Sequence, residues 1–349
     1  MVELRTTADA EVSETGAILL GKMFEVDSFA WRAIRVVSHF HSDHALNLSK
    51  SKKFASHIVA TPPTIEALIL MGHSLHDEKL LPVDYGRTIR FGDEALTLVK
   101  SSHVLGSAQI LVETSDGRRV GYTSDFKFPG TKIMSELDAL IIDATYGSES
   151  MVRPFKNEVD LLFSDLVLDL LSKGRPLVVR GYHGKLQEAM HILRKFGIEA
   201  PFIMPEKVYG LTKMAEKFGM RIGNYFSENS IEGKELLRDG WFIYMMHSNS
   251  RRVMLPNHSE ITLTGWFFLS PLKKIYENSR GEKWIVALSD HADFEDTMYY
   301  VEEARPKSLI IDGYRTSVEI AESFARAVKR RLGLEAAVMP KMQGTKEED

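Results

Sequence analysis

Three histidines and an aspartate lie close together in the segment 39–44, which reads His-Phe-His-Ser-Asp-His. Imidazole nitrogens and carboxylate oxygens are ligands of Zn²⁺ and similar metal ions. The two valines just upstream are β-branched and apolar, which predicts the end of a buried strand. If the strand continues, His39 and His41 point to one face, because side chains alternate. This spacing favours one metal ion at His39 and His41 and a second at Asp43 and His44. The alternative is a polar turn that happens to be rich in histidine.

Acids and a histidine also end other apolar runs of the chain. These runs end at Asp125, Asp143, His291 and Asp312. In α/β proteins, ligand sites form at the carboxyl ends of strands. A single acid at a strand end is commonly a turn residue. Its recurrence predicts instead that these side chains gather in one site.

Several motifs resemble one known family. They are His-x-His-x-Asp-His at 39–44, Asp-Ala-Thr-Tyr-Gly at 143–147 and Ser-Asp-His-Ala-Asp at 289–293. This combination resembles the metallo-β-lactamase superfamily and, within it, the β-CASP nuclease branch, especially ligase-associated exonucleases and mRNA 3′-end processing factors. Artemis-like nucleases are more distantly similar. The resemblance implies an α/β (α+β) fold, with a four-layer αββα metallo-β-lactamase core and an inserted α/β β-CASP cap domain. Residues 1–147 and 284–349 would form the core, and residues 148–283 the cap.

The resemblance also implies which residues bind metal. The implied ligands are His39, His41, His103 and Asp125 for a first zinc ion, and Asp43, His44 and Asp125 for a second. Asp312 is a further candidate, because relatives commonly carry histidine-glycine at this strand end. The alternative is that Asp312 caps the turn at Gly313. The implied catalytic residues are Asp43, Asp143 and His291, and Asp27 would support the metal site from behind its ligands.

A glycine turn in the expected cap is a candidate for substrate binding. Gly184 and Lys185 open a segment with a helical pattern, shortly after Arg180. The N-terminus of a helix presents unpaired N–H groups and a favourable dipole to phosphate. We therefore expect Arg180, Gly184 and Lys185 to contact the substrate.

Composition limits the class of protein. The chain has 349 residues, a formal net charge of −4 and no cysteine. Any metal site therefore uses nitrogen and oxygen ligands, and the absence of cysteine fits a cytoplasmic protein. No uncharged apolar run approaches the roughly 20 residues of a membrane span, so we expect no membrane partner. A nucleic-acid enzyme of this charge needs a local basic surface.

The resemblance implies a zinc-dependent hydrolase that cleaves phosphodiester bonds of DNA or RNA. Two Zn²⁺ ions per chain, or Mn²⁺ in their place, would activate water for in-line attack. The substrate would be single-stranded nucleic acid in the cleft between core and cap, and the reaction an exonuclease or RNA 3′-end-processing step in DNA repair or RNA processing. One alternative is a thioester or lactone hydrolase with the same core, which leaves the cap unexplained. The other is a non-catalytic scaffold in an RNA-processing assembly. The sequence does not choose DNA or RNA, or an oligomeric state.

Overall fold

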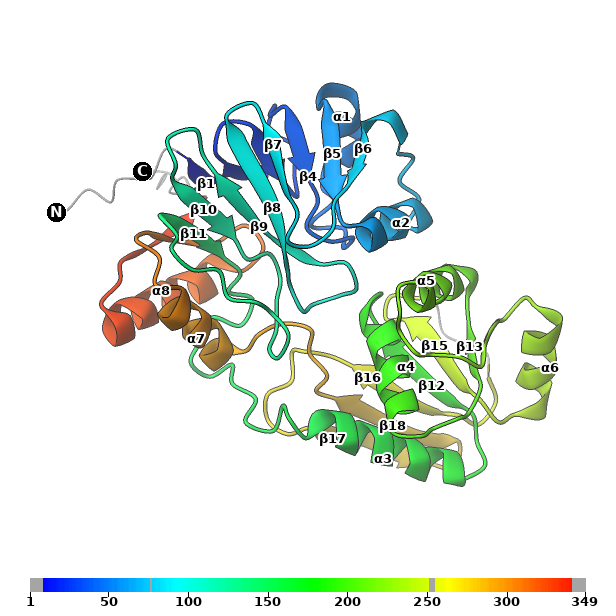
Figure 1. Ribbon diagram of the computed structural model, residues 1–349. Coiled ribbons are helices and arrows are strands. Elements are labelled where there is room, and N and C mark those ends of the chain that lie inside the picture. The colour runs from blue at the N-terminus through cyan, green and yellow to red at the C-terminus, as the bar shows by residue number, and fades with distance from the viewer. Residues whose placement is uncertain (1–8, 76, 251–254, 341–349) are drawn as a thin grey trace, which may run out of the picture. The chain divides into compact units, whose positions relative to one another are not determined.

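The computed structural model describes residues 9–75, 77–250 and 255–340 (Figure 1). The chain forms two compact units, one of Met1–Val152 with His291–Asp349 and one of Arg153–Asp290. The expected cap, 148–283, would end inside a strand of the second unit, Gly281–Val286. Among the described residues, no helix has the length and apolar character needed to cross a membrane.

The first unit begins with a six-stranded sheet. In spatial order its strands are β1 (Ala10–Val12), β2 (Ile18–Leu20), β3 (Phe24–Val26), β4 (Ile34–Val36), β5 (His57–Ala60) and β6 (Leu80–Pro82). The first three strands pair antiparallel, and β3 to β6 pair parallel. The carboxyl ends of β3, β4 and β5 therefore share one edge.

A seven-stranded sheet completes the sheet structure of the first unit. In spatial order its strands are β20 (Ala336–Met339), β19 (Leu309–Asp312), β11 (Ala139–Ile142), β10 (Arg119–Tyr122), β9 (Ala108–Glu113), β8 (Glu94–Lys100) and β7 (Thr88–Phe91). Strands β7 to β10 are antiparallel, whereas β10, β11, β19 and β20 are parallel. The segments that follow β10, β11 and β19 therefore leave the sheet at the same edge.

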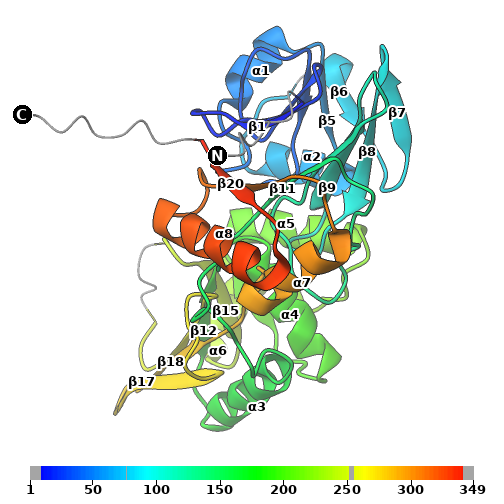
Figure 2. The ribbon, with the colours of Figure 1, turned by 90° about the vertical axis from the view of Figure 1, so that its left-hand side faces the viewer.

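Helices and sheets of the first unit form four layers. Apolar side chains of both sheets, such as Val36 and Ile110, pack in one buried core. The outer face of the second sheet packs on α7 (Phe294–Ala304) and α8 (Val318–Leu332), with Phe294 and Phe324 in the contact (Figure 2). The first sheet is accompanied by α1 (Leu48–Phe54), α2 (Pro62–Leu70) and the short helix η1 (Asp77–Lys79). This arrangement confirms the expected αββα core.

The second unit is an α/β domain built on one sheet. Its strands, in spatial order, are β14 (Tyr225–Ser227), β13 (Phe202–Met204), β15 (Ile243–His247), β12 (Leu177–Gly181), β16 (Ser259–Leu263), β18 (Gly281–Val286) and β17 (Leu272–Asn278). All pairings are parallel except that of β17 with β18. Its helices are α3 (Val159–Ser172), α4 (Lys185–Lys195), α5 (Glu206–Lys217) and α6 (Ile231–Asp239). The expected inserted α/β domain is thus present.

Candidate metal centre

The histidine-rich segment lies in a loop and does not continue the strand. β4 ends at Val36, because the next free amide, that of Ser38, donates to the Asp27 carboxylate at 2.8 Å and not to a neighbouring strand. The expectation that His39 and His41 share a strand face is therefore wrong. The loop turns back on itself through a hydrogen bond from His44 N to His41 O at 3.0 Å. This turn, not strand alternation, brings the imidazoles together.

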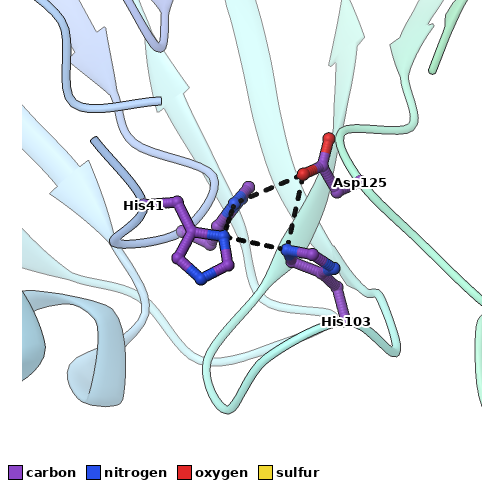
Figure 3. Close-up of side chains that lie close together, drawn as sticks. His41, His103 and Asp125 are labelled. Carbon is purple, nitrogen blue, oxygen red and sulfur yellow. Dashed lines mark hydrogen bonds and ion pairs between the residues drawn. The ribbon is translucent and has the colours of Figure 1, made fainter. Parts of the chain in front are cut away.

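Four side chains form a compact group of donor atoms (Figure 3). His41 Nδ1 lies 3.2 Å from His39 Nε2 and 3.1 Å from His103 Nε2. Asp125 Oδ2 lies 3.6 Å from His39 Nε2 and 3.4 Å from His103 Nε2. A tetrahedral zinc ion with bonds of about 2.0–2.1 Å separates its ligand atoms by about 3.3–3.4 Å. These four distances are close to that separation, and all the donor atoms lie within 4.8 Å of one another, so the group could hold one such ion.

His103 is positioned by a loop that is held against the start of α2. The Gly106 carbonyl accepts hydrogen bonds from Thr61 Oγ1 at 2.6 Å and Thr64 Oγ1 at 3.0 Å. Gly106 has φ +91°, and a Cβ there would lie 2.7 Å from Thr64 Oγ1. A larger residue would therefore displace the loop that carries His103.

Asp125 lies in a strained turn after β10. Ser124 has φ 52°, a left-handed conformation that non-glycine residues seldom adopt. Its hydroxyl donates to Ser38 Oγ at 2.7 Å, and Ser101 Oγ donates to the Asp125 carbonyl at 2.7 Å. Such strain persists where surrounding contacts over-determine the backbone, and it is common at functional sites.

The charge state of the group suits a metal ion. Burial lowers the pKa of His39 well below its ordinary value, and the neighbouring His44 and His103 lower it further. This imidazole is therefore neutral, as a metal ligand must be. Burial raises the pKa of Asp125, but His44, His291 and His103 outweigh it and hold the pKa well below the usual range. Asp125 is thus an anion in a buried, histidine-rich site.

His44 carries a buried nitrogen that is aimed at carboxylates. Its Nδ1 lies 2.7 Å from Asp27 Oδ2, an ionised acceptor, so Nδ1 carries a proton. Its Nε2 is buried and has no hydrogen-bond partner among the described residues, yet it lies 3.3 Å from Asp125 Oδ1 and 3.5 Å from Asp43 Oδ2. Burial lowers the His44 pKa, but Asp125, Asp43 and Asp27 raise it well above its ordinary value. One oxygen of Asp43 and one of Asp125 thus lie within 3.5 Å of His44 Nε2, and the binding of a second metal ion by these three residues remains a prediction.

Asp143 and His291 lie close to each other and to Asp125. His291 Nδ1 lies 3.3 Å from Asp143 Oδ2, and His291 Nε2 lies 3.9 Å from Asp125 Oδ2. Asp143 Oδ1 accepts from Thr145 N at 2.9 Å and Thr145 Oγ1 at 2.7 Å, which fixes the carboxylate. Asp125, Asp143 and His291 also form a possible metal-binding group. The expected catalytic pair therefore lies next to the expected metal ligands.

Asp312 makes different contacts. Its Oδ2 accepts from Arg315 Nη1 at 2.7 Å, and its Oδ1 accepts from Tyr314 N at 3.0 Å. Burial raises the pKa of Asp312, although the charge of Arg315 lowers it. These contacts match a turn-capping residue, so we leave Asp312 out of the ligand set. Sequence reasoning missed Arg315; the signal was an arginine three residues after a strand-end acid.

The expected substrate-binding residues lie in the second unit. Gly184 precedes α4, and its amide donates to Gln187 Oε1 at 2.8 Å. Lys185 is buried, and its Nζ lies 2.8 Å from Asp290 Oδ1. Arg180 Nε donates to Glu260 Oε2 at 3.0 Å at a cavity of about 880 Å³. Both cations are thus paired with acids, and their contact with substrate remains a prediction.

Comparison with known proteins places these features in context. No family model matches the chain. An "Uncharacterized protein in lig 3′region" of Acidianus ambivalens is 49% identical over 140 residues, which are 40% of this chain and 99% of that protein. A "Probable DNA ligase" of Opitutus terrae is 27% identical, covering 86% of this chain and 28% of that protein. A "Probable RNase MJ4" of Methanocaldococcus jannaschii is 23% identical, covering 61% of this chain and 58% of that protein.

The matched parts of the ligase and the RNase are thus less than two thirds of those proteins. Among solved structures, a protein of unknown function from Enterococcus faecalis matches with a TM-score of 0.55 at 15% identity. The match covers 80% of this chain and 74% of that one.

Proposed function

Since this chain belongs to the β-CASP nuclease branch of the metallo-β-lactamase superfamily, we propose that it is a metal-dependent nuclease. It hydrolyses phosphodiester bonds of RNA or DNA, as an exonuclease or an RNA 3′-end-processing enzyme. One observation supports this proposal: three imidazole nitrogens and a carboxylate oxygen lie within 4.8 Å of one another, and four of the distances between them are 3.1–3.6 Å, close to the spacing of ligands around one zinc ion.

We assign two metal ions to the chain. The first is bound by His39, His41, His103 and Asp125, and the second by Asp43, His44 and Asp125. When bound, such ions lower the pKa of water and neutralise charge on the phosphoryl group. Because Asp125 alone contributes to both sets, its loss would disturb both sites.

The remaining residues of the centre orient and transfer protons. Asp143 accepts from His291 Nδ1 and so directs His291 Nε2 toward Asp125. His291 is partly exposed, which allows it to reach a phosphate oxygen. We assign to His291 protonation of the leaving oxygen, and to Asp143 the positioning of its ring.

The test is cleavage of end-labelled single-stranded RNA and DNA with Zn²⁺ or Mn²⁺ supplied. Asp125→Ala should abolish cleavage and lower the bound metal measured by elemental analysis, while the fold persists. Asp116→Ala removes an exposed carboxylate elsewhere in the same unit and should change neither. Wild-type turnover by Asp125→Ala, or a metal-loaded wild type that cleaves thioesters or lactones but no nucleic acid, would refute the proposal.

A further inference from the structure

The first unit displays three aromatic rings beside α1, which we call the aromatic platform: Phe29, Trp31 and Phe54. Ring centroids are 4.8 Å apart for Phe29 and Trp31 and 4.7 Å apart for Trp31 and Phe54. Trp31 is 72% exposed and Phe54 is 48% exposed, whereas Phe29 is buried. Contiguous exposed aromatic surface of this kind marks an interaction site.

The backbone holds Trp31 outward. Trp31 has φ 63°, which is unfavourable for a bulky side chain. The buried Glu25 carboxylate accepts from Ala30 N at 2.6 Å and from Arg32 N at 3.1 Å, on both sides of Trp31. Glu25 also accepts from Ser51 Oγ of α1 at 2.8 Å. The loop and α1 are therefore fixed together, and the outward tryptophan belongs to a built structure.

Two lysines of α1 lie beside the platform. Lys50 Nζ lies 6.0 Å from the Phe29 ring centroid, and Lys53 Nζ lies 5.2 Å from that of Phe54. Lys52 lies between them on α1, and Lys79 Nζ donates to the Lys52 and Ala55 carbonyls at 2.8 and 2.9 Å. Within the described part of the chain, these four lysines form no ion pair. A chain of net charge −4 thus keeps a local group of uncompensated cations next to exposed rings.

We propose that the aromatic platform binds single-stranded nucleic acid at a distance from the metal centre. Bases stack on Trp31 and Phe54, and backbone phosphates contact Lys50 and Lys53. Phe29 and Trp31 precede β4 and Phe54 ends α1, whereas the histidine-rich loop directly follows β4. The inference deepens the proposed function and rests on it, since it identifies where a nuclease substrate is held beyond the reacting phosphate.

The lysines favour nucleic acid over a protein partner. Protein interfaces are enriched in tryptophan but depleted of lysine. Sites for single strands combine aromatic rings with positive charge. Unpaired lysines beside stacked rings therefore fit a polyanion that carries planar bases.

The experiment measures binding of a fluorescent single-stranded oligonucleotide to the metal-free protein, at several salt concentrations. Trp31→Ala should weaken binding between about fivefold and about 160-fold, the range for loss of one stacked base. Trp31→Tyr keeps a ring and should retain most of the affinity. The double variant Lys50→Gln with Lys53→Gln should reduce the slope of log affinity against log salt by about 1.4. Trp241→Ala, which removes a half-exposed tryptophan in the second unit, is the matched control.

Oligonucleotide binding and phosphodiester hydrolysis are measured in separate assays. All variants should hydrolyse a small chromogenic phosphodiester at the wild-type rate when metal is supplied, because it does not reach the platform. Equal affinity of wild type and Trp31→Ala for the oligonucleotide would refute nucleic-acid binding by the aromatic platform. The surface would then be a candidate site for a protein partner. Oligonucleotide binding that depends on Trp31, without cleavage of any substrate, would overturn only the proposed nuclease.

Discussion

The Asp27 carboxylate decides which nitrogen of His44 carries a proton. Asp27 is fully buried and accepts from Ser38 N at 2.8 Å, from Ser38 Oγ at 2.7 Å and from His44 Nδ1 at 2.7 Å. Burial raises the pKa of Asp27, but the His44 charge and hydrogen bond lower it in net. The ionised carboxylate therefore holds a proton on Nδ1, so that a metal ion would displace only the proton that Nε2 carries in the charged ring.

Asp27→Asn replaces one acceptor by a donor without changing the shape of the side chain. Whichever way the amide turns, its NH₂ group faces either the Ser38 amide or His44 Nδ1, both of which are donors. The conflict is relieved if His44 loses the proton on Nδ1 and keeps the one on Nε2, which faces Asp125 at 3.3 Å and Asp43 at 3.5 Å. A protonated Nε2 binds no metal, so we expect affinity at the second site to fall about 10- to 100-fold, or about 1.4–2.7 kcal/mol.

Metal titration with a competing chromogenic chelator measures this change. The first site, which uses His39, should keep its affinity in Asp27→Asn. ¹⁵N chemical shifts of the His44 imidazole should report protons on both nitrogens in the metal-free wild type and on Nε2 alone in the metal-free variant. Glu25→Gln alters an equally buried carboxylate whose hydrogen bonds, among the described residues, go to Ala30, Arg32 and Ser51, and it should leave both sites unchanged. Unchanged affinity at the second site, with the proton still on Nδ1, would refute the reasoning.

Three further predictions concern charges elsewhere. Lys185→Ala should lower the free energy of unfolding by about 3–5 kcal/mol in urea denaturation, because it breaks a buried ion pair whose Nζ and Oδ1 atoms lie 2.8 Å apart. A smaller loss with weaker oligonucleotide binding would favour phosphate contact. The hydrogen bond from Lys173 lowers the pKa of Glu282 to about 2. The contribution of Glu282 to the free energy of unfolding is therefore present above about pH 4.5 and is lost toward pH 2. Because Lys173 is partly exposed, Glu282→Gln should cost about 1–2 kcal/mol at pH 7 and nothing near pH 2, as thermal unfolding will show. His291→Ala should slow single-turnover cleavage more than it weakens oligonucleotide binding; equal effects would contradict a role in proton transfer.

The sequence alone predicted the side chains of the candidate metal centre. His39, His41, Asp43 and His44 are adjacent in the chain, so their grouping needs no folding over long distances. Strand-end acids such as Asp125 were also identifiable, because apolar runs in the sequence show where strands end. Parallel pairing of those strands then brings their carboxyl ends to one edge.

Only the tertiary structure decided how these side chains are used. An Asp27 carboxylate turns the chain away from β4, so the histidines converge in a loop and not on a strand face. Arg315 engages the Asp312 carboxylate, and Asp290 engages Lys185, so each side chain has a partner that local sequence did not indicate. The physical reason is that a side chain's type shows what it can bind, whereas the buried charges around it determine what it does bind.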